Sequence, residues 1–246
     1  INKNYFLYNF KIPYEIFISI IIPFYNSQNH IENCLDSLQK QSFKKTYEII
    51  MVDDGSTDGS VEIIKKCKNP FVKIFKLKEN KGPAAARNLG LRNSSGKYIF
   101  FLDADDTVSF DILTKLYDQV LENHYDIIFC DKKWIENSQN QRANTYLYSE
   151  NKILYEKEIK KEMEKRFSDP ISNVGIFGLT GRLIKRSIIT KNEIFFDEKL
   201  RYLEDETFSW QILSKIKSIK YLKFQLYNYN VNPNINSALS QSFSKG

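Results

Sequence analysis

Residues 18–26 read ISIIIPFYN, and residues 98–106 read YIFFLDADD. In both stretches a nearly unbroken apolar run stops abruptly at polar residues, which is typical of a strand buried on both faces of a parallel sheet. Similar apolar runs occupy residues 48–52, 72–77 and 126–130. Amphipathic stretches with apolar residues three or four positions apart separate these runs and predict helices. The alternation predicts βαβ units, and hence an α/β fold with a mainly parallel sheet flanked by helices.

The predicted helices carry start signals. Ser27 is the expected cap of the first helix, and Thr57 or Asp58 opens the second. Pro83 suits the first turn of a third helix, because its fixed φ is already helical. After residue 130 the regular alternation stops, so we expect a mixed C-terminal part. A last clear helix is expected to begin near Glu204.

One further helix is strongly charged. Its apolar residues recur at every fourth position, at Tyr155, Ile159, Met163 and Phe167. Glu and Lys are mixed along it, which favours a solvated surface helix over one that lies on a membrane.

Composition narrows the class of protein. The chain has 246 residues, 42% hydrophobic and 27% charged, which is ordinary for a globular domain. The net charge of +6 is spread among interspersed acids, so a nucleic-acid partner is not expected. Three separated cysteines suit a reducing compartment. No signal peptide and no apolar run of about 20 residues is recognised, and a start at isoleucine is compatible with a piece of a longer protein.

Polar clusters follow three of the predicted strands, at residues 23–26, 53–58 and 103–106. In open α/β sheets, ligands bind beyond the carboxyl ends of the strands, where these clusters would meet. Each cluster alone could also be a turn or a helix cap, because Asp, Asn, Gly and Ser form turns readily. Three clusters at one edge favour a binding site over three unrelated turns.

The spacing Asp103-x-Asp105 is the sharpest of these signals. Two carboxylates just past a strand end can share Mg²⁺ or Mn²⁺ and leave coordination positions for phosphate oxygens. The alternative is a solvated acidic loop that caps the next helix. No G-x-G-x-x-G follows the first strand and no Walker motif occurs, so a dehydrogenase or P-loop NTPase is disfavoured.

Taken in order, these motifs resemble family 2 glycosyltransferases of the GT-A fold. The resemblance runs from Ile18 to about Trp210, most of the chain. It rests on ISIIIPFYN at 18–26, VDDGSTD at 52–58, NKGPAAARNLG at 80–90, FLDADD at 101–106, TGRLIKR at 180–186 and LEDETF at 203–208.

The resemblance implies a role for each matching residue. Asp205 would be the catalytic base, and Asp105, with Asp103, would bind Mn²⁺ or Mg²⁺. Asp53 and Asp54 would include the carboxylate that hydrogen-bonds the base, usually uracil. Arg87 would reach the diphosphate or brace the acidic cluster. The remaining donor contacts would come from Pro23, Tyr25, Asn26, Asp103, Ala104 and Glu204.

The implied reaction is inverting transfer of a single sugar from a nucleoside-diphosphate sugar, usually of UDP, to a hydroxyl of a glycan or lipid-linked acceptor. Synthesis of a bacterial surface polysaccharide, lipooligosaccharide or glycoprotein glycan would use such an enzyme, in the cytoplasm or on the inner face of the plasma membrane. Two departures matter. LTGR at 179–182 stands where the family often has Trp-Asn-Lys, which weakens Arg182 as a substrate contact, and the Q-x-x-R-W signature of processive synthases is absent.

We expect residues 1–17 to be an extension or linker and 18–246 a single domain. Within that domain, 18–130 would bind the nucleotide sugar and 131–246 would face the acceptor. Two alternatives stay open. One is a degenerate module that binds the nucleotide sugar without turnover. The other is a sugar-phosphate nucleotidyltransferase, although the Gly/Arg/Lys-rich loop expected after its first strand is missing.

Overall fold

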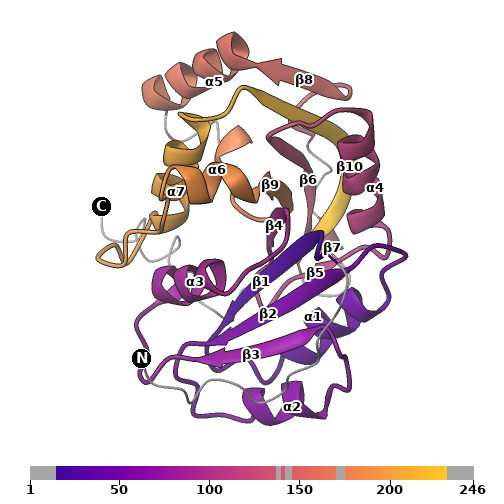
Figure 1. Ribbon diagram of the computed structural model, residues 1–246, viewed down its shortest axis with the longest axis vertical. Helices are drawn as coiled ribbons and strands as arrows, with labels where there is room; N and C mark the ends of the chain where they lie inside the picture. The colour runs from indigo at the N-terminus through magenta and orange to yellow at the C-terminus, as the bar shows by residue number, and fades with distance from the viewer. Residues whose placement is uncertain (1–14, 137–139, 142–145, 170–174, 232–246) are drawn as a thin grey trace.

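A single sheet runs through the computed structural model (Figure 1), which describes residues 15–136, 140–141, 146–169 and 175–231. The strand order is β3-β2-β1-β4-β9-β6-β10-β5, with β7 paired to β6 and β8 to β10. The strands are β1 (Ile18–Phe24), β2 (Tyr47–Asp53), β3 (Val72–Lys76), β4 (Tyr98–Phe101), β5 (Thr107–Val108), β6 (Ile127–Glu136), β7 (Asn140–Gln141), β8 (Lys152–Tyr155), β9 (Arg182–Lys185) and β10 (Ser218–Val231).

The first four strands are parallel, and the rest of the sheet is mixed. β1 pairs in parallel with β2 and β4, so that Ile18 lies opposite both Tyr47 and Tyr98. β9 is antiparallel to both β4 and β6, between which it lies. β10 is parallel to β6 and antiparallel to β5 and β8. The predicted α/β architecture with a mixed C-terminal part is confirmed. β9 lies between β4 and β6, so the two predicted halves, residues 18–130 and 131–246, share one sheet. That the first half binds the nucleotide sugar and the second faces the acceptor stays a prediction.

Helices cover both faces of the sheet. They are α1 (Ile31–Gln39), α2 (Ser60–Lys66), α3 (Pro83–Arg92), α4 (Ile112–Glu122), α5 (Glu156–Ser168), α6 (Arg186–Lys191) and α7 (Glu204–Leu213), with a short 3₁₀ helix, η1 (Gly175–Phe177). Ile20 and Ile22 of β1 pack with α1, α2 and α4, whereas Ile21 between them packs with α3 and α7. This alternation follows from the two-residue period of a strand. Each such side chain contributes roughly 1.5–3 kcal/mol when fully buried.

Two predicted helix starts need correction, whereas those at Pro83 and near Glu204 are confirmed. Ser27 does not cap α1: the helix begins at Ile31, after a turn in which the Ser27 carbonyl accepts the N–H groups of His30 and Ile31 at 2.9 Å. α2 begins at Ser60, two residues later than expected, although Asp58 accepts the backbone N–H of Ser60 at 3.0 Å. Pro83 occupies the first turn of α3, as predicted.

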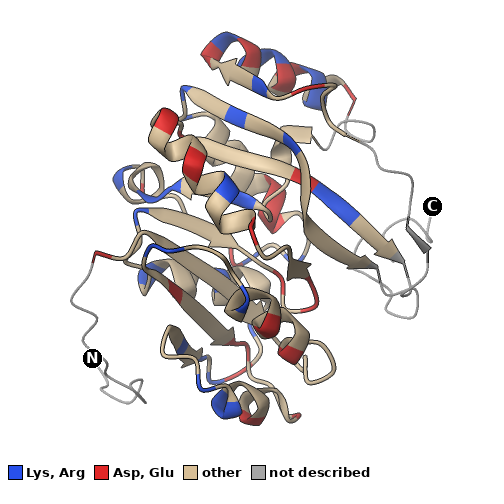
Figure 2. Cartoon of the chain, turned by 90° about the vertical axis from the view of Figure 1, so that its right-hand side faces the viewer, with Lys and Arg blue, Asp and Glu red and all other residues tan. Residues whose placement is uncertain are grey.

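The charged helix α5 lies at the surface, as expected, at the end of the molecule that carries β8 (Figure 1). Figure 2 shows Lys and Arg interspersed with Asp and Glu along it. Its apolar positions are not equivalent, since Ile159 is 1% exposed and Phe167 is 83% exposed. Among the described helices, none is both long enough and apolar enough to span a bilayer.

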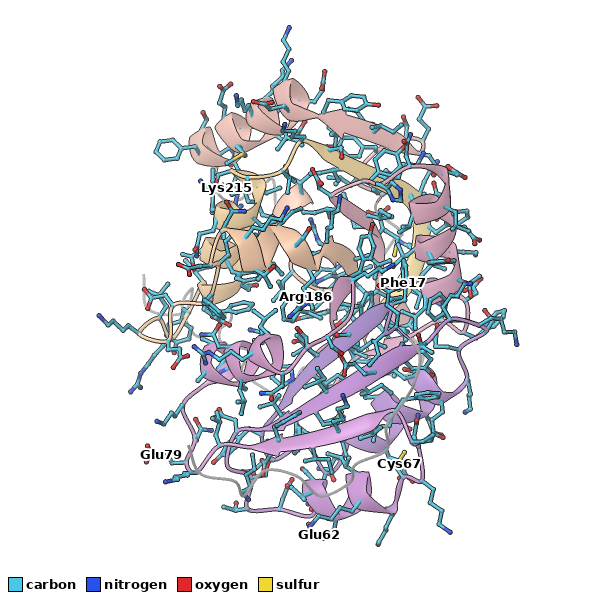
Figure 3. The ribbon with its side chains drawn as sticks, in the orientation of Figure 1. Phe17, Glu62, Cys67, Glu79, Arg186 and Lys215 are labelled. Carbon is cyan, nitrogen blue, oxygen red and sulfur yellow. The ribbon has the colours of Figure 1, made fainter. Side chains whose placement is uncertain are left out.

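The packed domain includes Phe17, one residue before the predicted domain start. Its ring lies 4.7 Å from that of Tyr117 on α4 and 5.4 Å from that of Tyr98 on β4, and its backbone N–H donates to the Thr46 carbonyl (Figure 3). Residues 1–14 of the predicted extension and residues 232–246 lie outside the described part of the chain.

A buried acid, Glu48 on β2, ties the strands that support the polar edge. Its Oε1 accepts the hydroxyl of Ser19 on β1 at 2.6 Å and the backbone N–H of Ser95, before β4, at 2.8 Å. Its Oε2 accepts Lys73 of β3 at 2.7 Å. Burial alone would raise the pKa of Glu48, but these hydrogen bonds hold it below its ordinary value. One carboxylate therefore links β1, β2, β3 and the approach to β4.

We expect Glu48→Gln to lower the free energy of unfolding by about 2–3 kcal/mol at pH 7, because buried donors lose a charged acceptor. A carboxyl group whose pKa is lower in the folded state stabilises the fold above its unfolded-state pKa, and that contribution is lost as pH falls through the folded-state pKa. The difference between native and variant protein should therefore shrink below about pH 4.3.

Urea unfolding between pH 7 and pH 3 measures this difference. Glu150→Gln, at an exposed acid, is the control and should stay within about 0.5 kcal/mol of native stability. A destabilisation by Glu48→Gln that does not change with pH would contradict the role of the charge.

Candidate active site

The loops after β1 and β2 are joined by direct hydrogen bonds. Asn26 adopts a left-handed conformation (φ 47°), which asparagine tolerates better than most residues. Its backbone N–H donates to Ser56 Oγ at 3.0 Å, and its Oδ1 accepts the Thr57 N–H at 2.9 Å. Of the other predicted residues here, Pro23 is half-buried at the end of β1 and Tyr25 is 46% exposed. The structure therefore brings together the first two polar clusters.

Asp53 and Asp54 are both buried but have different hydrogen-bond partners. Asp54 accepts the backbone N–H groups of Lys81 and Gly82, each at 2.8 Å, and so shapes the loop that leads into α3. Burial raises the pKa of Asp54, although these two hydrogen bonds oppose the shift. Asp53 Oδ1 accepts the Ser56 N–H at 2.7 Å. Its buried Oδ2 lies 3.1 Å from Lys76 Nζ, yet accepts no hydrogen bond from a described residue. Both oxygens of Asp54 thus accept backbone N–H groups, whereas Asp53 Oδ2 has only the ion pair with Lys76.

Arg87, on α3, bridges two acidic segments that are far apart in the sequence. Its Nη2 donates to Asp103 Oδ1 at 3.0 Å and its Nη1 to Glu204 Oε1 at 2.9 Å. Burial alone would lower the pKa of this guanidinium, but the charges of Asp103, Glu204 and Asp205 raise it above its ordinary value. Arg87 is thus a permanent cation between β4 and α7.

The predicted Asp103–Asp106 cluster contains three different environments. Ala104 is buried, and Asp103 is partly exposed. Asp105 is exposed at the surface, yet desolvation by the surrounding protein, and next the charge of Asp103, raise its pKa. Asp106 is 1% exposed and accepts the Tyr227 hydroxyl at 2.5 Å and the Asn230 N–H at 2.8 Å. Burial, reinforced by Asp103 and Asp105, raises the pKa of Asp106 to about 8.

The donor set of Asp103 and Asp105 fits a hard divalent cation. Asp103 uses Oδ1 for Arg87, and its Oδ2 accepts no hydrogen bond within the described chain. The carboxylate of Asp105 is likewise uncommitted. The described residues contain no group of three or more His, Cys, Asp and Glu side chains arranged to hold a metal ion. Mg²⁺ is commonly bound by one or two carboxylates together with substrate phosphates, which is the arrangement that these residues could supply.

Glu204 and Asp205 open α7 but do different things. Glu204 is 8% exposed, and its carboxylate is engaged by Arg87. Asp205 is half-buried; its Oδ1 accepts the N–H of Glu206 at 2.8 Å, and its other oxygen accepts no hydrogen bond from a described residue. Leu203 before them adopts a left-handed conformation (φ 60°), an unfavourable geometry for leucine that points to a constrained turn.

Sequence reasoning missed the contribution of β6 and β10. Tyr227 of β10 is buried; its hydroxyl donates to Asp106, and the Asp103 N–H donates to it at 3.3 Å. Lys132 of β6 lies with its Nζ 5.4 Å from the centres of the Tyr227 and Tyr229 rings. No sequence pattern marks these residues, because strand pairing over a long separation brings them to the site.

Arg182 forms its hydrogen bonds with the 3₁₀ helix η1 rather than with the acidic cluster. It is 5% exposed and donates to the carbonyl of Gly175 at 2.9 Å and to that of Ile176, and its guanidinium lies 4.4 Å from the centre of the Phe129 ring. Burial lowers its pKa to about 9.

A pocket of about 570 Å³ borders Asp105 on the side of α1 and β5. Asp105 is the only predicted site residue in its wall. The pocket is lined by His30, Asn33, Asp36, Ser37, Lys40, Asp105, Thr107, Val108, Phe110 and Asn230.

Comparison with known proteins identifies the family to which the chain belongs. The family model described as "Glycosyl transferase family 2" matches residues 19–191. The chain is 32% identical to the uncharacterized glycosyltransferase EpsJ of Bacillus subtilis, over 88% of this chain and 62% of EpsJ. It is 36% identical to the minor teichoic acid biosynthesis protein GgaA of the same organism, over 81% of this chain and 44% of GgaA.

Among solved structures, that of S. aureus TarS residues 1–349 in complex with UDP superposes with a TM-score of 0.74 and 25% identity, covering 89% of this chain and 61% of that one. A complex of the same TarS fragment with UDP-GlcNAc gives a TM-score of 0.75. TarS is described as a poly(ribitol-phosphate) beta-N-acetylglucosaminyltransferase. The chain thus spans less than two thirds of the length of each of these three relatives. The chain belongs to glycosyl transferase family 2, and its sheet and flanking helices have the GT-A fold.

Proposed function

We propose that this chain transfers a single sugar, with inversion, from a nucleoside-diphosphate sugar to an acceptor hydroxyl. The observation that carries the proposal is the Arg87 bridge, which holds Asp103 beside the start of α7, where Asp205 lies. A diphosphate group and a proton acceptor are the two things that such a reaction must bring together.

UDP is the proposed nucleotide. The TarS structures with UDP and UDP-GlcNAc support this choice. So does Asp53 Oδ2, which is ion-paired with Lys76 but accepts no hydrogen bond from a described residue, and which could accept a ring N–H such as that of uracil. Pro23, Tyr25 and Asn26 would line the nucleoside pocket.

Asp103 and Asp105 would hold Mn²⁺ or Mg²⁺ against the two phosphates. The cation, when bound, neutralises the negative charge that develops on the leaving nucleoside diphosphate. Arg87 keeps Asp103 oriented and lessens the mutual repulsion of the acids around it.

Asp205 would accept the proton of the attacking hydroxyl. One of its oxygens is fixed by a backbone N–H, and the other is uncommitted. A carboxylate held in this way can act as the general base. A direct attack from the side opposite the leaving group inverts the anomeric carbon.

The acceptor would be a glycan or a polyol polymer of a bacterial surface, built in the cytoplasm or at the inner face of the membrane. The names of GgaA and TarS, which concern teichoic acid and poly(ribitol-phosphate), support this class. A module that binds the donor without turnover is the competing function. Release of UDP in the presence of acceptor distinguishes the two.

The metal assignment is tested by UDP binding. Asp105→Asn in Mn²⁺, and EDTA added to the native protein, should each weaken UDP binding by about tenfold or more, because a hard oxygen ligand or the cation itself is lost. Calorimetric titration measures the affinity. Asp36→Asn, which removes an exposed carboxylate from the neighbouring pocket, should leave it unchanged. Full affinity in excess EDTA would refute the assignment.

The base assignment is tested by a matched pair of variants. Asp205→Asn should lower kcat by roughly a hundredfold or more while UDP affinity stays constant, because the amide cannot take the proton. Glu204→Gln should cost less turnover, since the new amide oxygen can still accept from Arg87. Steady-state kinetics and UDP titration separate these effects. Near-native kcat in Asp205→Asn, or a larger loss in Glu204→Gln, would overturn the assignment.

Arg87→Lys tests the bridge. One ammonium cannot reproduce a planar fork that reaches two carboxylates, so Asp103 and α7 should lose their fixed spacing. We expect kcat/KM to fall about tenfold or more with secondary structure retained. Arg92→Lys is the control on the same helix, where the side chain is exposed and 3.9 Å from Glu198. An unchanged kcat/KM in Arg87→Lys would mean that the bridge has no catalytic role.

A further inference from the structure

Lys132 is a cation of the site that forms no salt bridge with a described carboxylate. It lies half-buried on β6, and its Nζ lies over the rings of Tyr227 and Tyr229, 5.4 Å from each centre. Within the described chain it forms no hydrogen bond or ion pair. By contrast, Lys73 and Arg87 reach their carboxylate partners at 3.0 Å or less.

The ammonium group of Lys132 lies over the ring of Tyr227, whose hydroxyl donates to Asp106 and accepts the Asp103 N–H. Burial, together with the charge of Arg182, lowers the pKa of Lys132, whereas the charges of Asp103, Asp106 and Asp205 oppose this shift. The faces of Tyr227 and Tyr229 attract a cation without using up its N–H donors. Lys132 therefore offers three hydrogen-bond donors beside the acidic cluster, and they are available to a polar ligand.

The position of Lys132 in the sheet indicates whether its ligand belongs to the sugar donor or to the acceptor. The loops proposed to bind the nucleotide follow β1 and β2, whereas β6 and β10 lie on the other side of β4, beyond β9. Lys132 thus approaches the centre from the side opposite to the nucleoside pocket. An anionic group on the acceptor would meet its charge there.

We propose that Lys132 binds a phosphate group of the acceptor and so selects phosphate-bearing acceptors over neutral ones. The inference rests on the proposed function, since it assumes that the acceptor lies beside Asp205. A charge-assisted hydrogen bond of this kind changes affinity by about tenfold to a hundredfold.

The probes are glycerol 3-phosphate and glycerol, titrated by NMR into protein saturated with UDP and Mg²⁺. The native protein should bind the phosphate ester at least about tenfold more tightly than glycerol. Lys132→Met should abolish that preference, and Lys132→Arg should retain most of it. Lys133→Met is the matched control. Its side chain is also half-buried but points to the other face of β6, so the preference should persist.

Three results would overturn the inference: a native protein that does not prefer the phosphate ester, a Lys132→Met variant that keeps the preference, or a Lys132→Met variant that loses UDP affinity instead. The last would assign the lysine to the donor diphosphate. UDP affinity and melting temperature are measured first for every variant. If neither the native protein nor any variant binds UDP, the assignment of UDP as the donor nucleotide is refuted. Titration of the nucleotide-free protein with the same two probes then still decides whether Lys132 binds the phosphate group.

Discussion

The pair of ion pairs made by Arg87 is the interaction on which the site depends. It joins Asp103 and Glu204, which are 16 and 117 residues away in the sequence. Isolated burial of any of the three charges would be costly, and removing one partner of a buried pair typically costs about 3–5 kcal/mol. The arginine is therefore both a tie between β4 and α7 and a compensating charge. The spacing between Asp103 and the start of α7 is thus held by one side chain on α3.

Around this tie, acids are packed more closely than folding alone would favour. Burial, and next the charges of Asp103 and Asp105, raise the pKa of Asp106 and disfavour a further negative charge there. Tyr227 and the backbone N–H of Asn230 donate to the carboxyl group of Asp106, and these hydrogen bonds offset the free-energy cost of burying it. Asp105 has no such partners and stays exposed. Of these two neighbouring acids, Asp106 is held by hydrogen bonds within the protein, whereas Asp105 is available to a ligand. Asp106 is therefore a structural acid, and Asp105 is a candidate for binding.

Sequence patterns predicted the part of the site that depends on local signals. Parallel strands place their carboxyl ends at one edge, so three polar clusters could be assigned to one site before any contact was known. The predicted capping role of Ser27 was wrong because a turn intervenes before α1, and in that turn the Ser27 N–H donates to Ser60 at the start of α2. Neither β9 nor the positions of Tyr227 and Lys132 beside the acidic cluster could be predicted. They depend on pairing across many residues, and the four-residue β9 carries no strand pattern distinct from a helix start.

The different commitments of Glu204 and Asp205 follow from helix geometry. Successive side chains on an α-helix diverge by about 100°, so two adjacent acids cannot both face α3. Glu204 faces Arg87 and becomes part of the tie. Asp205 is directed elsewhere and keeps one oxygen free, while the N–H groups of the first turn of α7 favour negative charge on both. Two adjacent acids at the start of a helix can therefore have different roles. Glu204, on the helix face that packs against α3, fixes the helix, and Asp205, on another face, keeps a carboxylate oxygen available for a ligand.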